Sequence, residues 1–266
     1  MPAELLRHRS VLWNLTLREI RVRYKQSLLG VGWALFVPLV MMLTFSFVFS
    51  RLTSVADSFA TTMPYPIFLY LGLLPWVFFS QSISTATASL VANRNLVTKI
   101  YFPREVFPFS AILSCLFDFL LAATVLVGLI AWYHLTTPWE FHLHPTALWA
   151  PVVLLVQIAF TAGLALWLSL ANLFYRDVKY LVTVLLQLWM FLTNVIYPLP
   201  SDDPLVRALI NTNPMTPIIS SYRRVLIDGL SPEGGPLLGA LLISAVVFLS
   251  GWRVFQGTQH RFAECI

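Results

Sequence analysis

Charged side chains are scarce in this sequence. Only 11% of its 266 residues are Asp, Glu, Lys or Arg, whereas a soluble globular domain carries roughly a quarter. Hydrophobic residues make up 58% of the chain. A surface with so few charges suits lipid better than water, so the composition excludes an ordinary soluble domain and indicates a membrane protein.

Cysteines and phosphate-binding glycine loops are also lacking. Cys115 and Cys265 match no metal-ligand spacing and are expected at different depths, so they indicate neither a disulfide nor a metal site. None of Lys25, Lys99 and Lys179 follows a glycine, so there is no GxxxxGKS or GxxxxGKT loop to cradle a nucleotide. If ATP powers this chain, another polypeptide binds it.

Recognisable catalytic motifs are absent as well. There is no HExxH and no GxSxG. A metal site stays open as an alternative for one loop cluster: His134, Glu140, His142 and His144. The aromatic residues around it favour a belt at the membrane surface instead. An enzyme acting on lipid-linked sugars, such as a glycosyltransferase, would need external acids, and the candidates are Asp57, Asp202 and Asp203.

Long apolar segments are what the chain has in abundance. A helix needs about 20 largely apolar residues to cross a bilayer, and six segments qualify: residues 30–50, 66–90, 109–133, 146–172, 181–198 and 236–256. The sequence therefore predicts an all-α polytopic membrane protein, with residues 1–266 as one transmembrane domain. Six spans place both termini on one side, together with thirteen of the seventeen Lys and Arg residues. Because basic residues resist translocation, both termini are predicted to be cytoplasmic.

Residues 10–29 predict an amphipathic helix at the membrane surface. At 100° per residue its apolar side chains share one arc: Trp13, Leu17, Ile20, Tyr24 and Leu28. Cations occupy much of the remainder: Arg18, Arg21, Arg23 and Lys25. Leu12, Leu15 and Val22 break the pattern, and Gly30 and Gly32 offer a corner before the first span. The helix is either only a membrane anchor or also a lever that contacts a cytoplasmic partner.

Asp118 is the acidic residue expected well inside a span. Proton and ion pathways need several ionisable groups within the membrane, so one acid argues against an ion-driven transporter. The preferred interpretation of Asp118 is a hydrogen bond to a Ser, Thr or backbone group on a neighbouring span, which packs the helices together. A role in gating is the alternative.

Five elements, in their order along the chain, carry a resemblance to a known family. They are LREIRVRYKQSLLGVGWALFVPL (17–39), GLLPWVFFS (72–80), NRNLVTKIYFPREVFP (93–108), NLFYRDVKYL (172–181) and NPMTPIISSYRRVL (213–226). The third alternates cations with apolar residues, as suits one helix that docks into a groove of a soluble partner. Together the five resemble the permease subunits of ABC-2 type exporters of lipid-linked polysaccharides, such as O-antigen, teichoic acid and group 2 capsule.

The resemblance implies a homodimer in the bacterial inner membrane, joined to two copies of a separate ABC ATPase that binds ATP and Mg²⁺. This chain is expected to bind no cofactor, metal or nucleic acid itself. The implied coupling helix on the ATPase comprises Asn93, Arg94, Leu96, Lys99, Tyr101, Phe102, Arg104 and Glu105. The implied gate helix comprises Trp13, Leu17, Arg18, Ile20, Arg21, Tyr24 and Lys25.

A passage for a glycan needs aromatic surfaces and few fixed charges. Trp76, Phe78 and Phe79 follow Pro75, where a bend would turn the rings toward a dimer seam. Packing in the core, or facing lipid near the headgroups, is the alternative for each ring.

The external segment 198–235 is too long for a simple turn. Within it, residues 213–226 are expected to form a short re-entrant helix. Arg223 and Arg224 are expected to meet a phosphate of the lipid carrier or the rim of the channel.

Overall fold

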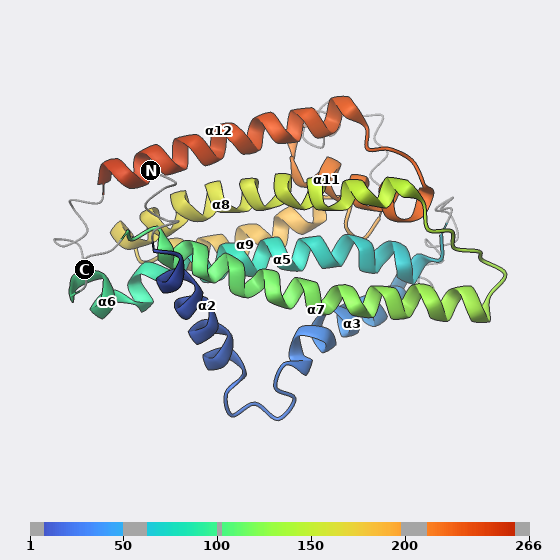
Figure 1. The fold of residues 1–266 in the computed structure, drawn as a ribbon, viewed down its shortest axis with the longest axis horizontal. Helices are drawn as coiled ribbons and strands as arrows, with labels where there is room; N and C mark the ends of the chain where they lie inside the picture. Colours follow the sequence, from blue (N-terminus) through green and yellow to red (C-terminus); the bar gives the residue numbers. More distant parts are fainter. Residues whose placement is uncertain (1–7, 50–62, 100–102, 198–211, 259–266) are drawn as a thin grey trace.

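The computed structural model describes residues 8–49, 63–99, 103–197 and 212–258, and these ranges contain helices and no strand (Figure 1). The predicted all-α architecture is confirmed. With the labels of Figure 1, the helices are α2 (Arg9–Tyr24), α3 (Gly32–Phe47), α5 (Tyr65–Ala92), α6 (Arg94–Lys99), α7 (Val106–Thr136), α8 (Ala150–Phe174), α9 (Val178–Phe191), α11 (Met215–Arg223) and α12 (Gly234–Thr258). Two short helices join them: η2 (Pro145–Trp149) and η3 (Arg224–Asp228).

Within the described ranges, four helices are long and apolar enough to cross a membrane: α5, α7, α8 with η2, and α12. The helices α3 and α9 have 16 and 14 residues, which is short of the about 20 that a span needs. The helix α9 stops at Phe191 because the chain turns over the next residues. Each of the six predicted segments overlaps one of these helices, while the number of six spans stays a prediction.

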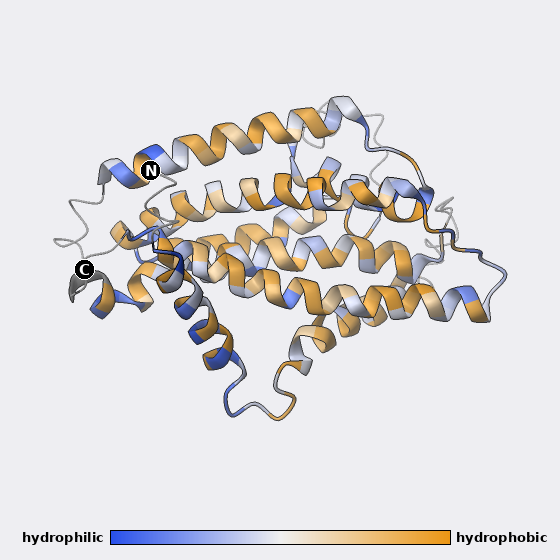
Figure 2. Ribbon diagram, in the orientation of Figure 1, coloured by the Kyte–Doolittle hydropathy of each residue, from blue (hydrophilic) through white to orange (hydrophobic). Residues whose placement is uncertain are grey.

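The helix α5 forms the centre of the bundle. It packs against α3, α7, α8, α9 and α11, and Ile67, Leu69 and Leu73 on it are fully buried. Figure 1 shows α7, α8 and α12 extending along the same long axis. Apolar residues dominate the middle of these long helices, whereas hydrophilic residues gather on α2 and near the helix ends (Figure 2). We call the two ends of the bundle the α6 end and the α11 end.

Two glycines allow α8 and α12 to approach closely. A Cβ atom added to Gly163 would lie 2.6 Å from the backbone nitrogen of Phe248, and one added to Gly251 would lie 2.7 Å from the carbonyl oxygen of Gly163. Both distances are shorter than van der Waals contact, so neither position accepts a side chain without separating the helices. Close approach through small residues stabilises helix pairs in membranes, where packing replaces the hydrophobic effect.

The helices α2 and α3 form a V that leaves the bundle (Figure 1). The helix α2 ends at Tyr24 because Lys25 has extended backbone angles and Gln26 has a φ of 62°. Gly30, with a φ of 52°, completes the corner before α3. The prediction of one helix over residues 10–29 was therefore too long, and Leu28 lies exposed in the turn.

The predicted helix over residues 93–108 is also divided. Only Arg94–Lys99 form α6, and α7 begins at Val106. Pro108 lies in the first turn of α7, where proline is tolerated because the N–H groups there have no helical partner. The segment is thus a short helix followed by a connection.

Candidate functional site

Polar side chains attach α2 to α7. Arg23 donates to the carboxylate of Asp118, and the hydroxyl of Tyr24 donates to the other oxygen of Asp118 at 2.5 Å. Arg23 also donates to the hydroxyl of Ser114 at 3.1 Å. The side chains of Arg23 and Asp118 are 26% and 22% exposed. Asp118 therefore serves helix packing, through partners on α2 that the sequence did not identify.

One turn closer to the start of α2, Glu19 adds a second contact. The hydroxyl of Ser110, on α7, donates to Glu19 Oε1 at 3.2 Å, while Oε2 is buried without a hydrogen-bond partner. Burial raises the pKa of Glu19, because desolvation disfavours the charged carboxylate. The docking of α2 thus includes one group that responds to protonation.

The face of α2 that meets the protein differs from its predicted apolar arc. Leu15 and Thr16 are buried, and Leu12 packs beside Leu15 in a cluster with α5, α7, α8 and α12. Of the predicted arc, Trp13 is 60% exposed. Leu17, Ile20 and Tyr24 are half-buried, and the cations Arg18, Arg21 and Lys25 are exposed. The leucines at positions 12 and 15, which break the amphipathic pattern, are those that bind the bundle.

The residues of the predicted coupling segment have different environments. Asn93 accepts a hydrogen bond from Arg18 and donates to the carbonyl of Ser89. Leu96 is half-buried against the cluster at the α6 end, and Glu105 is buried beside Gln256 of α12. This burial favours an internal role for Glu105 over contact with a partner.

The remaining residues of the predicted coupling segment are exposed, half-buried or outside the described ranges. Arg94 is exposed and Arg104 is half-buried. Lys99 ends α6, and Tyr101 and Phe102 lie outside the described residues. The assignment of this segment to an ATPase stays a prediction.

A groove of about 340 Å³ lies between α3, α5 and α9. Its apolar walls include Met41, Trp76 and Leu186. Hydroxyl and amide side chains line the rest: Ser80, Gln81, Ser84, Thr183 and Gln187. None of the described residues that line it is charged. Spacings of three and four residues place these side chains on one face of α5 and one face of α9.

The sequence analysis did not identify these hydroxyl and amide side chains as the lining of one groove. The signal was available as Ser80, Gln81 and Ser84 on one helix and Thr183 and Gln187 on another, each at helical spacing within an apolar segment. What the pattern could not reveal is that the two faces meet.

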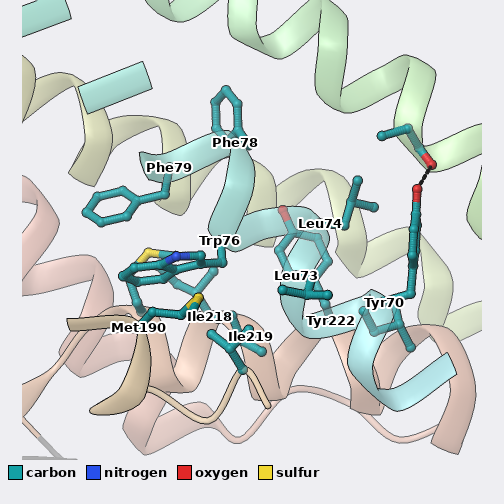
Figure 3. Packing of buried hydrophobic residues seen from close by; sticks show 14 of the residues in the cluster. Tyr70, Leu73, Leu74, Trp76, Phe78, Phe79, Met190, Ile218, Ile219 and Tyr222 are labelled. Carbon is teal, nitrogen blue, oxygen red and sulfur yellow. Dashed lines mark hydrogen bonds between the residues drawn. The ribbon is translucent and has the colours of Figure 1, made fainter. Parts of the chain in front are cut away.

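The three predicted path aromatics do not share one face of α5. Figure 3 shows Trp76 beside Met190 of α9 and Phe79 on the same side of α5, whereas Phe78 points away from them. The ring centroids of Trp76 and Phe79 are 5.5 Å apart. Phe79 is fully buried and stacks on Phe160 of α8, with ring centroids 5.6 Å apart. Phe78 is buried against Phe119 of α7. The structure favours core packing for Phe78 and Phe79, whereas Trp76 also borders the groove.

Arg223 lies inside the protein. Its guanidinium donates to the carbonyls of Asn194, Val195 and Phe68 at 2.7, 2.9 and 3.1 Å, and it stacks 3.6 Å from the ring centroid of Phe68. It therefore joins the turn after α9 to α5. These contacts favour a structural role over the expected contact with a phosphate.

Gly72 makes room for that guanidinium. A Cβ at Gly72 would lie 2.5 Å from Arg223 Nη2 and 2.4 Å from the carbonyl oxygen of Val195. The glycine thus permits close contact between α5, the turn after α9 and α11.

Arg224 points to a different environment from Arg223. It is half-buried and its Nη1 donates to Glu233 at 2.9 Å.

The alternatives that the sequence left open for a metal or an enzyme gain no support. No group of three metal-ligating side chains occurs in the described residues, so the loop residues His134, Glu140, His142 and His144 form no such group. The external acids Asp57, Asp202 and Asp203 lie outside the described residues.

Comparisons with known proteins agree with one another. A family model described as ABC-2 type transporter matches residues 10–227. The O-antigen export system permease protein RfbA of Myxococcus xanthus is 31% identical over 266 residues, covering 99% of this chain and 98% of that protein. A protein of the same name from Klebsiella pneumoniae is 28% identical and covers 95% of this chain and 93% of its own length. The polysialic acid transport protein KpsM of Escherichia coli is 24% identical, with 91% of each chain covered.

Proposed function

Because the chain belongs to the ABC-2 type transporter family, as a permease subunit that works with a separate ATPase, we propose that it exports a lipid-linked polysaccharide across the bacterial inner membrane. Two copies would enclose the passage, and two ATPase copies would hold the ATP and Mg²⁺. Relatives named for O-antigen export and polysialic acid transport support polysaccharide as the cargo. Family membership also favours a permease over the glycosyltransferase alternative, because ABC permeases are not enzymes themselves.

The observation that carries the proposal is the groove between α3, α5 and α9. Gln81, Ser84, Thr183 and Gln187 are exposed there on otherwise apolar helices. In hydrocarbon these amides and hydroxyls would lack the hydrogen bonds that water gives them. A second copy against α3 and α9 would enclose them in a wet passage. Uncharged hydrogen-bonding groups suit a glycan, because sugar hydroxyls both donate and accept.

The contacts of α2 support a route for coupling. Asn93, directly before α6, accepts a hydrogen bond from Arg18 of α2. Arg23, also on α2, donates to Asp118 of α7. An ATPase that displaces α6 would therefore also displace α2, and the turn at residues 25–31 would carry this motion to α3. Val37 and Met41 of α3 line the groove.

The distribution of cations supports cytoplasmic termini. The basic residues lie near helix ends: Arg94 begins α6, Arg176 lies between α8 and α9, Lys179 lies in the first turn of α9, and Arg253 lies near the end of α12. These helix ends are all at the α6 end of the bundle (Figure 1). Basic residues gather on the cytoplasmic side of membrane proteins.

Cysteine accessibility tests the passage. In a variant with Cys115→Ser and Cys265→Ser, single cysteines at Ser84 and Gln187 are expected to react with a water-soluble maleimide in the assembled transporter, and less when polysaccharide fills it. A cysteine at Leu120, which is exposed on α7, serves as the lipid-facing control and should stay unlabelled. Export by a transporter in which neither groove position reacts would contradict this location.

Co-expression tests the partner. We expect the chain to copurify with an ABC ATPase and to export polysaccharide only when that ATPase can hydrolyse ATP. Export sustained by the permease alone in vesicles would refute the proposed division between the two subunits.

A further inference from the structure

We propose a second binding site, for a neutral sugar unit, in a pocket at the α11 end of the bundle. The inference rests on the proposed function for the class of its ligand. The pocket has a volume of about 330 Å³ and lies between α11, η3 and the start of α12. This volume is at the lower end of the ~300–1,000 Å³ that small-molecule sites have. The pocket shares no lining residue with the groove between α3, α5 and α9.

Thr216 supplies a hydroxyl that the fold does not use. Its Oγ1 is buried and has no hydrogen-bond partner, although the residue lines the pocket. Leaving a buried hydroxyl unpaired costs free energy. Rotation of the Thr216 side chain toward the pocket would let the hydroxyl bind a ligand there and would remove that cost. Ser220, also in the lining, accepts a hydrogen bond from Asn194 at 2.6 Å, so its hydroxyl retains a proton to donate.

The charges in the pocket select for a neutral ligand. Arg224 and Glu233 both line the pocket and form an ion pair, so the lining has no net charge to attract a phosphate. The contacts of Arg224 use Nε and Nη1, which leaves donors on Nη2 and an acceptor on the second oxygen of Glu233. A sugar hydroxyl is donor and acceptor at once and can bridge the two.

The remaining walls suit the apolar face of a sugar ring. Pro217 and Pro236 border the pocket with rigid apolar rings. The side chains of Arg224 and Glu233 are 32% and 58% exposed, so the pocket opens to the outside of the described fold. In the proposed orientation this opening faces away from the cytoplasm, where it could hold a sugar unit that leaves the passage.

Two conservative variants test the site. Thr216→Val removes the unused hydroxyl at nearly constant shape, and Glu233→Gln removes one charge. The probes are mannose, galactose, rhamnose and N-acetylglucosamine, each as monosaccharide and disaccharide, added to the permease–ATPase complex in nanodiscs. Saturation-transfer NMR is expected to detect binding of at least one probe, with about five- to tenfold weaker affinity in each variant. Thr124→Val on the exposed face of α7 is the matched control and should bind as the wild type.

Three results would overturn the site: no probe binds the wild type, both variants keep its affinity, or inorganic phosphate displaces the sugar. The same preparations are assayed for ATP-dependent export of polysaccharide, with thermal melts to verify that the variants fold. Export without sugar binding would remove the site and leave the proposed function intact. Sugar binding without export would remove the proposed function and leave the site.

Discussion

Arg23 of α2 donates to the carboxylate of Asp118 of α7, a residue 95 positions later in the chain. The same carboxylate accepts from Tyr24, so Asp118 holds the last turn of α2. Next to it, a cavity of about 230 Å³ extends between α2, α3, α5 and α7. The pair therefore fixes α2 beside a space into which its end could move.

Removing either partner should loosen α2. We expect Asp118→Asn and Arg23→Gln each to weaken its docking by about 2 kcal/mol, because a hydrogen bond to a charged group is lost and the other partner is left half-buried. Hydrogen exchange of α2 in the purified protein measures this. Arg21→Gln is the control, since Arg21 is exposed on the same helix; equal exchange in all three variants would contradict the role of the pair.

Gly72 should accept no larger residue. Gly72→Ala would push a methyl group against Arg223 and the carbonyl of Val195, so we expect a thermal midpoint lowered by several degrees or loss of folded protein. Gly128→Ala makes the same change on α7, where an added Cβ meets nothing within 4 Å. There the gain in helix propensity should leave stability unchanged or raise it by about 0.5–1 kcal/mol. Similar melting of the two variants would argue against the close contact.

Gly163 should be required for the contact between α8 and α12. Gly163→Val is expected to destabilise the protein by about 2 kcal/mol or more, because its side chain overlaps the backbone at Phe248. Thermal denaturation in detergent, followed by circular dichroism, measures the loss. Gly239→Val on α12 tests whether valine itself is the cause, since an added Cβ there meets no neighbour.

The docking of α2 should depend on pH through Glu19. Because burial raises its pKa above the ordinary value of 4.5, docked α2 binds more protons than free α2 between these two values. Docking is therefore strongest below pH 4.5 and weakens as the pH rises through the raised pKa. Hydrogen exchange of α2, corrected for the intrinsic rate, should show this trend.

Two variants separate Glu19 from other acids. Glu19→Gln should make the protection of α2 independent of pH in that range. Glu140→Gln, at an exposed position outside α2, should keep the wild-type dependence. A pH trend that survives in Glu19→Gln would assign the effect to another group.

The sequence by itself determined the membrane class, the helical architecture and the position of each long apolar segment. It did so because composition and helical periodicity are local properties, which also carried the resemblance to a permease family. It indicated that Asp118 would pack helices, whereas the apolar arc that it assigned to α2 leaves Trp13 exposed. The end of α2 at Tyr24 escaped it, since it depends on backbone angles at single residues. The division of residues 93–108 into α6 and the start of α7 escaped it as well.

Only the tertiary structure decided which partners these faces meet. Leu12 and Leu15 broke the amphipathic pattern because they bind the bundle, and Asp118 found its partners on α2 rather than on a neighbouring span. The sequence also did not show that Arg223 lies in the interior or that Gln81 and Gln187 line the same groove. Periodicity tells which side chains share a face of a helix, but contact between distant segments is fixed by how whole helices pack.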